Sequence, residues 1–190
     1  MAKPDNFNVN LLLRGFTSIQ VGIYIIIAAY IFQSLISGFL VDDNPAGMMS
    51  VEIIELIVVI VMVLVIVFSS FAIYFKGRRL AKRNHHKLWN KKTKKAFAKF
   101  LAFLAVTFIT LLFLKNKGYI SFIVPAFLVI YGNYLYIVKT KKRKTLLVIT
   151  GLCLLLAAYC FVIPSYWYYS LFTLGIAHIT YGVVVKNHQS

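Results

Sequence analysis

Lysine and arginine occur along this chain in blocks that alternate with long apolar runs, and this alternation limits the fold more than any other feature. An apolar run of about 20 residues is long enough, as a helix, to cross the hydrocarbon core of a bilayer. Six runs approach or exceed that length, at residues 17–40, 53–75, 97–114, 119–138, 145–163 and 166–185. We therefore predict an all-α integral membrane protein in which residues 1–190 form a single bundle of six transmembrane helices.

The basic residues also predict the orientation of the bundle. Nineteen of the 21 Lys and Arg residues fall on one side of the six spans, and only Lys115 and Lys117 fall on the other. Four of the five acidic residues share the side of these two lysines. Because cytoplasmic loops carry an excess of Lys and Arg, we expect both the N-terminus and the C-terminus in the cytoplasm. The high Lys, Ile and Asn usage and the short turns favour a bacterial inner (cytoplasmic) membrane.

The longest basic segment, residues 76–99, is interpreted as a cytoplasmic loop with eleven Lys and Arg residues. A net charge of +16 would suggest nucleic acid as the partner of a soluble protein, but these charges flank apolar spans. Anionic lipid at the cytoplasmic face is the better expectation, and nucleic acid is not expected. The predicted lipid contacts are Arg78, Arg79, Lys82, Arg83, Lys87, Lys91, Lys92, Lys94 and Lys95.

His178 is the ionisable side chain placed deepest in a predicted span. Ionisable groups within the membrane are costly, so a functional role is the starting hypothesis. Gly175, His178 and Gly182 share one helix face, where small residues allow another helix to come close. Counted from the outer ends of their spans, His178 and Asn133 lie at similar depths.

Two interpretations of His178 remain open at this stage. It is either a neutral side chain that hydrogen-bonds across two helices, or part of a proton, ion or ligand site. The candidate intramembrane polar site consists of His178, Asn133, Tyr131, Tyr136 and Tyr181.

A second polar group lies near the outer ends of the first two spans. Gln33 and Ser37 share a helix face, and Glu52 and Glu55 open the second span. These four residues form a candidate outer vestibule. A solvated helix end with an ordinary hydrogen bond between helices would use the same residues.

The sequence offers no metal or cofactor motif. His85 and His86 are adjacent, so on a helix they point in different directions and do not share one metal ion. Cys153 and Cys160 lie seven residues apart, which is beyond the reach of a disulfide on one helix. Together with Ala157 they form a stripe of small residues that suits helix packing.

One local pattern bears on catalysis. Ala177, His178 and Gly182 resemble the histidine-bearing helix of rhomboid intramembrane proteases, whose core also has six spans. The resemblance implies a nucleophilic serine on the fourth span, but that span reads Ile130-Tyr-Gly-Asn-Tyr-Leu135 and has none. We therefore expect no enzymatic activity.

Two functions from different classes remain. The first is a non-enzymatic protein that acts as an accessory or regulatory subunit of a membrane assembly, with a membrane-protein partner or a second copy of the chain. The alternative is a small-solute or ion transport protein with a polar site around His178 and Asn133. A transporter needs a hydrated path to His178, whereas an accessory subunit can be packed solid.

Overall fold

The computed structural model describes residues 15–39, 51–83, 89, 91–119, 122–138 and 146–187. Within these segments the chain is helical and contains no strand. The helices are α1 (Phe16–Phe39), α2 (Val51–Arg83), α3 (Lys91–Asn116), α4 (Ile123–Val138), α5 (Leu146–Val162), the short 3-10 helix η3 (Pro164–Tyr166) and α6 (Trp167–Asn187).

Several of these helices are long and apolar enough to cross a membrane. Length and composition qualify four stretches in the described segments: Phe16–Leu35, Leu56–Lys82, Thr93–Asn116 and Pro164–Val185. The helices α4 and α5 are equally apolar but shorter, at 16 and 17 residues. At about 1.5 Å per residue, a helix of 16 residues covers roughly 24 Å, which is less than the usual hydrocarbon thickness. For the described residues, the prediction of an all-α chain with several helices long and apolar enough to span a membrane is confirmed.

The helices extend further into the basic segment than the apolar runs suggested. α2 continues to Arg83 and α3 begins at Lys91, so part of the expected loop at residues 76–99 is helical. Basic residues are good helix formers and do not end a helix when the chain leaves an apolar environment. Near this end of the two helices Ala81 and Thr93 are buried, and Trp89 meets Phe97 edge to face at 5.4 Å.

The described residues fall into two compact units, which divide the chain within α2, between Ala72 and Ile73, and at the start of α6, between Trp167 and Tyr168. One unit contains the described residues of Ile73–Trp167. The other contains those of Arg14–Ala72 and Tyr168–Ser190.

In the first unit, α4 packs against both α3 and α5. Leu128 and Cys153 are fully buried, and Gly132 lies where α4 meets α5. A Cβ built at Gly132 would lie 3.1 Å from the Cβ of Cys153, so the two helices approach closely there. On the other side of α4, Tyr134 stacks on Phe103 of α3 with ring centroids 4.5 Å apart.

The turn after α3 explains why the chain reverses so sharply. The Gly118 N–H donates to the Lys115 carbonyl at 2.9 Å, and the Tyr119 N–H donates to the Leu114 carbonyl at the same distance. Gly118 has φ +76°, in the left-handed region that glycine adopts without strain. This is a Schellman termination, and it satisfies the last carbonyl groups of the helix.

Candidate functional site

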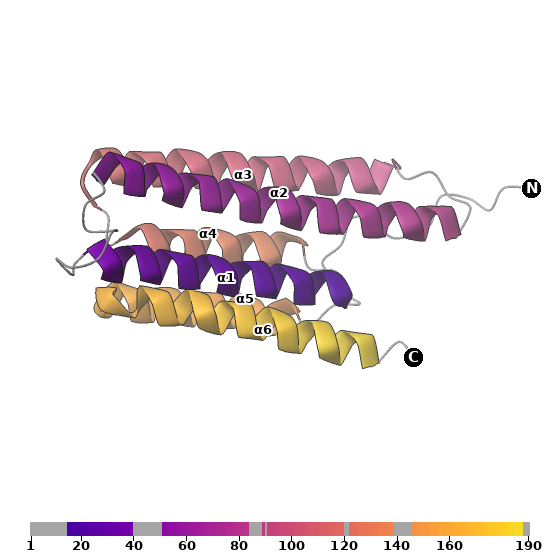
Figure 1. Ribbon diagram of the computed structural model, residues 1–190. Helices are drawn as coiled ribbons and strands as arrows, with labels where there is room; N and C mark the ends of the chain where they lie inside the picture. The colour runs from indigo at the N-terminus through magenta and orange to yellow at the C-terminus, as the bar shows by residue number, and fades with distance from the viewer. Residues whose placement is uncertain are drawn as a thin grey trace, which may run out of the picture. The chain divides into compact units, whose positions relative to one another are not determined.

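The second unit contains the residue that the sequence placed deepest in the membrane, at a close contact between α1 and α6. The two helices run antiparallel and lie side by side (Figure 1). A Cβ at Gly22 would lie 2.5 Å from the carbonyl oxygen of Gly175, and a Cβ at Gly182 would lie 2.7 Å from that of Gly15. Neither position has room for a side chain. Glycine therefore allows the two backbones to touch, as small residues do between membrane helices.

His178 lies at this contact and is fully buried. The Ser18 hydroxyl donates to the backbone carbonyl of His178 at 2.9 Å, and the Ser18 oxygen is 3.2 Å from Nδ1 of the same histidine. A hydroxyl has one proton, so the imidazole must supply the proton of the second bond. With both bonds made, Nδ1 of His178 carries a hydrogen.

The arrangement suits helix packing better than nucleophilic catalysis. An activated serine donates its proton to the histidine that acts as base, and that histidine is oriented by a third group. Here the Ser18 proton is donated to a backbone carbonyl, so the histidine does not receive it. The pair joins α1 to α6 and satisfies polar groups that the membrane would otherwise leave without water.

Ser18 was missed by the sequence analysis. The first span was assigned a start at residue 17, and Ser18 was not identified as a candidate residue. A signal was nevertheless available, because Gly15, Ser18 and Gly22 have the same spacing as Gly175, His178 and Gly182. Two helices with matching small-residue faces are suited to pack together.

The predicted partners of His178 lie in different places. Tyr181 is buried on α6, in the same unit as His178. Tyr131, Asn133 and Tyr136 are on α4, in the other unit. Tyr131 is buried and its ring is stacked with Phe127. Asn133 and Tyr136 are exposed, and a pairing of either with His178 stays a prediction.

The candidate outer vestibule falls partly outside the described residues. Gln33 is half-buried on α1. Ser37, Glu52 and Glu55 lie in α1 and α2, but their side chains are not among those described. The vestibule therefore stays a prediction.

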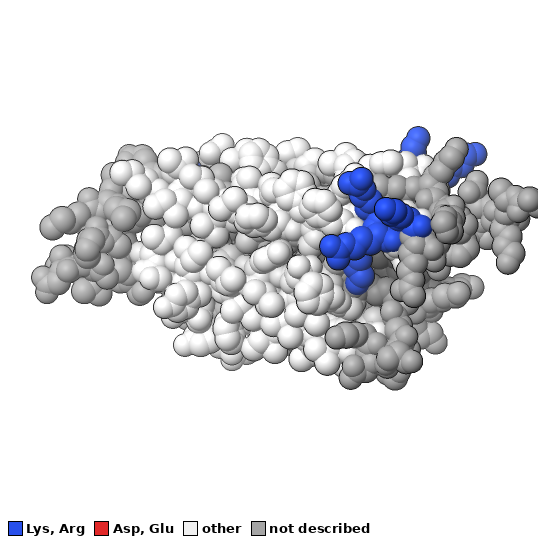
Figure 2. Space-filling view, turned by 45° about the vertical axis from the view of Figure 1, so that its right-hand side comes forward, with Lys and Arg blue, Asp and Glu red and all other residues white. Residues whose placement is uncertain are grey.

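The predicted lipid-binding cluster lies at the end of α2 and the start of α3, within one unit. The exposed members are Arg78, Arg79, Lys82, Lys91, Lys94 and Lys95. Figure 2 shows described Lys and Arg side chains gathered at this end of the molecule, while the rest of the visible described face is almost entirely uncharged. The side chains of Arg83 and Lys92 are not described, and Lys87 lies outside the described residues.

Lys99, one turn further along α3, has a separate contact. Its Nζ lies 3.4 Å from the carbonyl oxygen of Ile137, in the last turn of α4. A cation is favourable at that helix end, because the last carbonyl groups carry partial negative charge. The contact holds the start of α3 against the end of α4.

The two cysteines occupy the predicted packing stripe. Cys153, Ala157 and Cys160 are all buried on α5, and neither cysteine forms a disulfide. Among the described residues, no three His, Cys, Asp or Glu side chains lie close enough to hold a metal ion.

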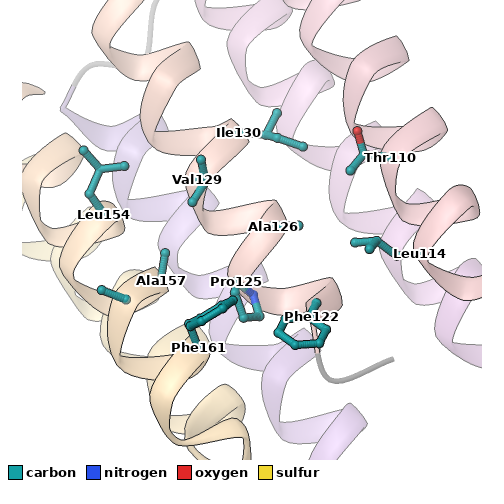
Figure 3. Close-up of a pocket in the computed structure, with 11 residues that line it drawn as sticks. Thr110, Leu114, Phe122, Pro125, Ala126, Val129, Ile130, Leu154, Ala157 and Phe161 are labelled. Atoms are coloured by element: carbon teal, nitrogen blue, oxygen red, sulfur yellow. The ribbon is translucent and has the colours of Figure 1, made fainter. Parts of the chain in front are cut away.

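A groove lies between α3, α4 and α5 in the first unit (Figure 3). Its volume is about 570 Å³. Its walls are apolar except for Thr110, with Leu114 on α3, Phe122, Pro125, Ala126, Val129 and Ile130 at α4, and Leu154, Ala157, Ala158 and Phe161 on α5. The groove could not be predicted from the sequence, because its shape depends on how three helices pack.

No family model, curated protein or solved structure matches this chain. The function must therefore be argued from the residues and their geometry.

Proposed function

We propose that this chain is a non-enzymatic protein of a bacterial inner membrane that acts by association, as an accessory or regulatory subunit of a membrane assembly. In this proposal all six helices cross the bilayer and both termini are cytoplasmic. The division of nineteen basic residues against two supports the orientation. Apolar α4 and α5 would span as short helices, with local thinning of the bilayer at modest cost.

The exposure of α2 is the observation that carries the proposal. None of the residues in its most apolar stretch, within Leu56–Lys82, is buried by the rest of the chain. Leu56, Val63 and Phe71 each leave half or more of their surface uncovered. A helix that the rest of the chain covers so little is available to a partner helix.

The state of His178 supports the same conclusion. Its Nδ1 and backbone carbonyl are bonded to Ser18 at a contact too tight for a side chain on either neighbouring glycine. A histidine held in this way stabilises a helix pair. It need not accept or release protons to do so.

A photoreactive amino acid at Val63 of α2 tests the proposal in intact cells. We expect irradiation to join the chain to one defined membrane protein, or to a second copy, as a discrete band. The matched control is the same amino acid at Val148 of α5, which is also exposed and apolar and should give lipid adducts alone. Lipid adducts alone from Val63 would contradict the association.

Transport of a small solute or ion is the second candidate, and one observation favours it. His178 is an ionisable side chain buried within a predicted span and already bonded to a hydroxyl group. Polar chains of this kind form proton relays in transporters. The purified chain in proteoliposomes should then conduct a solute or protons, whereas the accessory subunit should not.

A further inference from the structure

The groove between α3, α4 and α5 runs along the helices for a distance that matches one leaflet of a bilayer. Its α4 wall extends from Phe122 to Ile130, which corresponds to roughly 12 Å along a helix. The hydrocarbon of one leaflet is about 15 Å thick, half of the whole core. An acyl chain lying along the helices in this groove would therefore stay within a single leaflet.

The lining is suited to such a chain. The ring centroids of Phe122 and Phe161 lie 5.4 Å apart at one end of the groove (Figure 3). Ala126 and Ala158, which also line the groove, have small side chains. Burying each methylene group of an acyl chain is favourable in water, but lipid tails compete equally inside a bilayer. Shape alone would hold a lipid weakly, so selectivity requires a second contact.

Charge supplies that contact at the same end of the groove. Thr110 and Leu114 line its α3 wall, and Lys117 follows Leu114 three residues later. Lys115 is the neighbour of Leu114, and both lysines are exposed. The hydrogen bond from Tyr119 N–H to the Leu114 carbonyl folds this turn back onto the end of α3. Both lysines thus lie within three residues of Leu114, which lines the groove.

These two lysines are the exceptions to the charge distribution of the whole chain. The orientation rule gives no reason for lysines on the side that carries almost no other Lys or Arg. A phosphate bound by Lys115 and Lys117 would provide such a reason.

We propose that the groove holds one acyl chain of an anionic phospholipid whose headgroup phosphate contacts Lys115 and Lys117. In the orientation proposed above this lipid belongs to the outer leaflet. The site is separate from the basic cluster on α2 and α3, which is at the other end of α3. It does not depend on whether the chain is an accessory subunit or a transporter.

Photolabelling with two lipid probes tests the proposal. The full chain is placed in nanodiscs with either phosphatidylglycerol or phosphatidylcholine that carries the same diazirine in the acyl chain, and adducts are mapped by mass spectrometry. We expect phosphatidylglycerol to label the groove residues more than phosphatidylcholine does. Each lysine should raise the ratio of the two labelling yields about five-fold, because a cation near an anionic group contributes about 1 kcal/mol. Equal labelling by the two probes would overturn the proposal.

Two sets of variants separate the acyl chain from the headgroup. Lys115→Gln with Lys117→Gln should remove the preference for phosphatidylglycerol, while Lys91→Gln with Lys94→Gln, at the other end of α3, should leave groove labelling unchanged. Ala158→Trp should fill the groove and abolish labelling by both probes. Ala158 is exposed, so the larger ring enters the groove without displacing the core.

Ala105→Trp is the control for added bulk, because Ala105 is exposed on α3 and does not line the groove. Both probes should label Ala105→Trp as they label the unmodified chain. Labelling that persists in Ala158→Trp would overturn the proposal. A dimer of the unmodified chain that Ala158→Trp dissociates would also overturn the proposal, because a helix of a second copy would then occupy the groove.

Discussion

The Ser18 oxygen contacts both the imidazole and the backbone carbonyl of His178, at 3.2 Å from Nδ1 and 2.9 Å from the carbonyl oxygen. One residue of α1 therefore fixes both the position of α6 and the tautomer of its histidine. Because Ser18 donates to the carbonyl, the ring must donate from Nδ1. The two contacts of Ser18 predict different effects for different substitutions at His178.

His178→Asn should retain most of the stability of the helix pair, because the asparagine amide nitrogen lies close to where Nδ1 was. His178→Leu should cost about 0.6–1.7 kcal/mol, from the average to the maximum found for hydrogen bonds between membrane helices in double-mutant cycles. Thermal unfolding in detergent measures both. If His178→Leu were as stable as the unmodified chain, the bond would contribute nothing.

The same asparagine variant separates packing from transport. If His178 carries protons, its value lies in an imidazole that titrates near neutral pH, which an amide does not do. His178→Asn would then fold normally but abolish any pH-dependent flux in proteoliposomes. We expect no such loss. If the unmodified chain conducts and the stable His178→Asn variant does not, the result would favour the transport hypothesis instead.

Gly22→Ala should destabilise the contact between α1 and α6 severely. The added Cβ would lie 2.5 Å from the backbone carbonyl oxygen of Gly175, so one helix must move. We expect a loss of about 1–3 kcal/mol, as for other overpacked positions. Gly151→Ala on α5 is the matched control, because nothing lies within 4 Å of its added Cβ. Its helix propensity should improve stability by up to about 1 kcal/mol.

Arg78, Arg79, Lys82 and Arg83 replaced together by glutamine should reduce the retention of anionic lipid. Each cation near an anionic surface contributes about 1 kcal/mol, and salt screens the exposed ones. Native mass spectrometry at low and high salt would compare bound phosphatidylglycerol with phosphatidylcholine. An unchanged ratio in the glutamine variant would contradict this role.

Cysteine labelling with an impermeant reagent tests the orientation. Cysteines introduced at Asn44 and Asn116 should react from outside the cell, and those at Asn90 and Thr140 should not. The native Cys153 and Cys160 are buried, so the unmodified chain should give a low background. Labelling of the Asn90 position in intact cells would reverse the proposed topology.

Much of the helical content could be predicted from the sequence, but helix ends could not. The apolar run of the second span ended at residue 75, yet α2 continues to Arg83, because basic residues are good helix formers. Gly118, between the predicted third and fourth spans, provides the left-handed conformation that ends α3.

The sequence alone determined that apolar helices long enough to cross a membrane would form, and which ends would carry the positive charge. Both properties are local, because helix length and charge are set by neighbouring residues. The partner of His178 and the groove along α4 were decided by the tertiary structure. The matched glycines of α1 and α6, more than 150 residues apart, bring Ser18 to the imidazole by letting two backbones touch. A periodic pattern shows which face of a helix will pack, but complementary shapes decide which other helix packs against it.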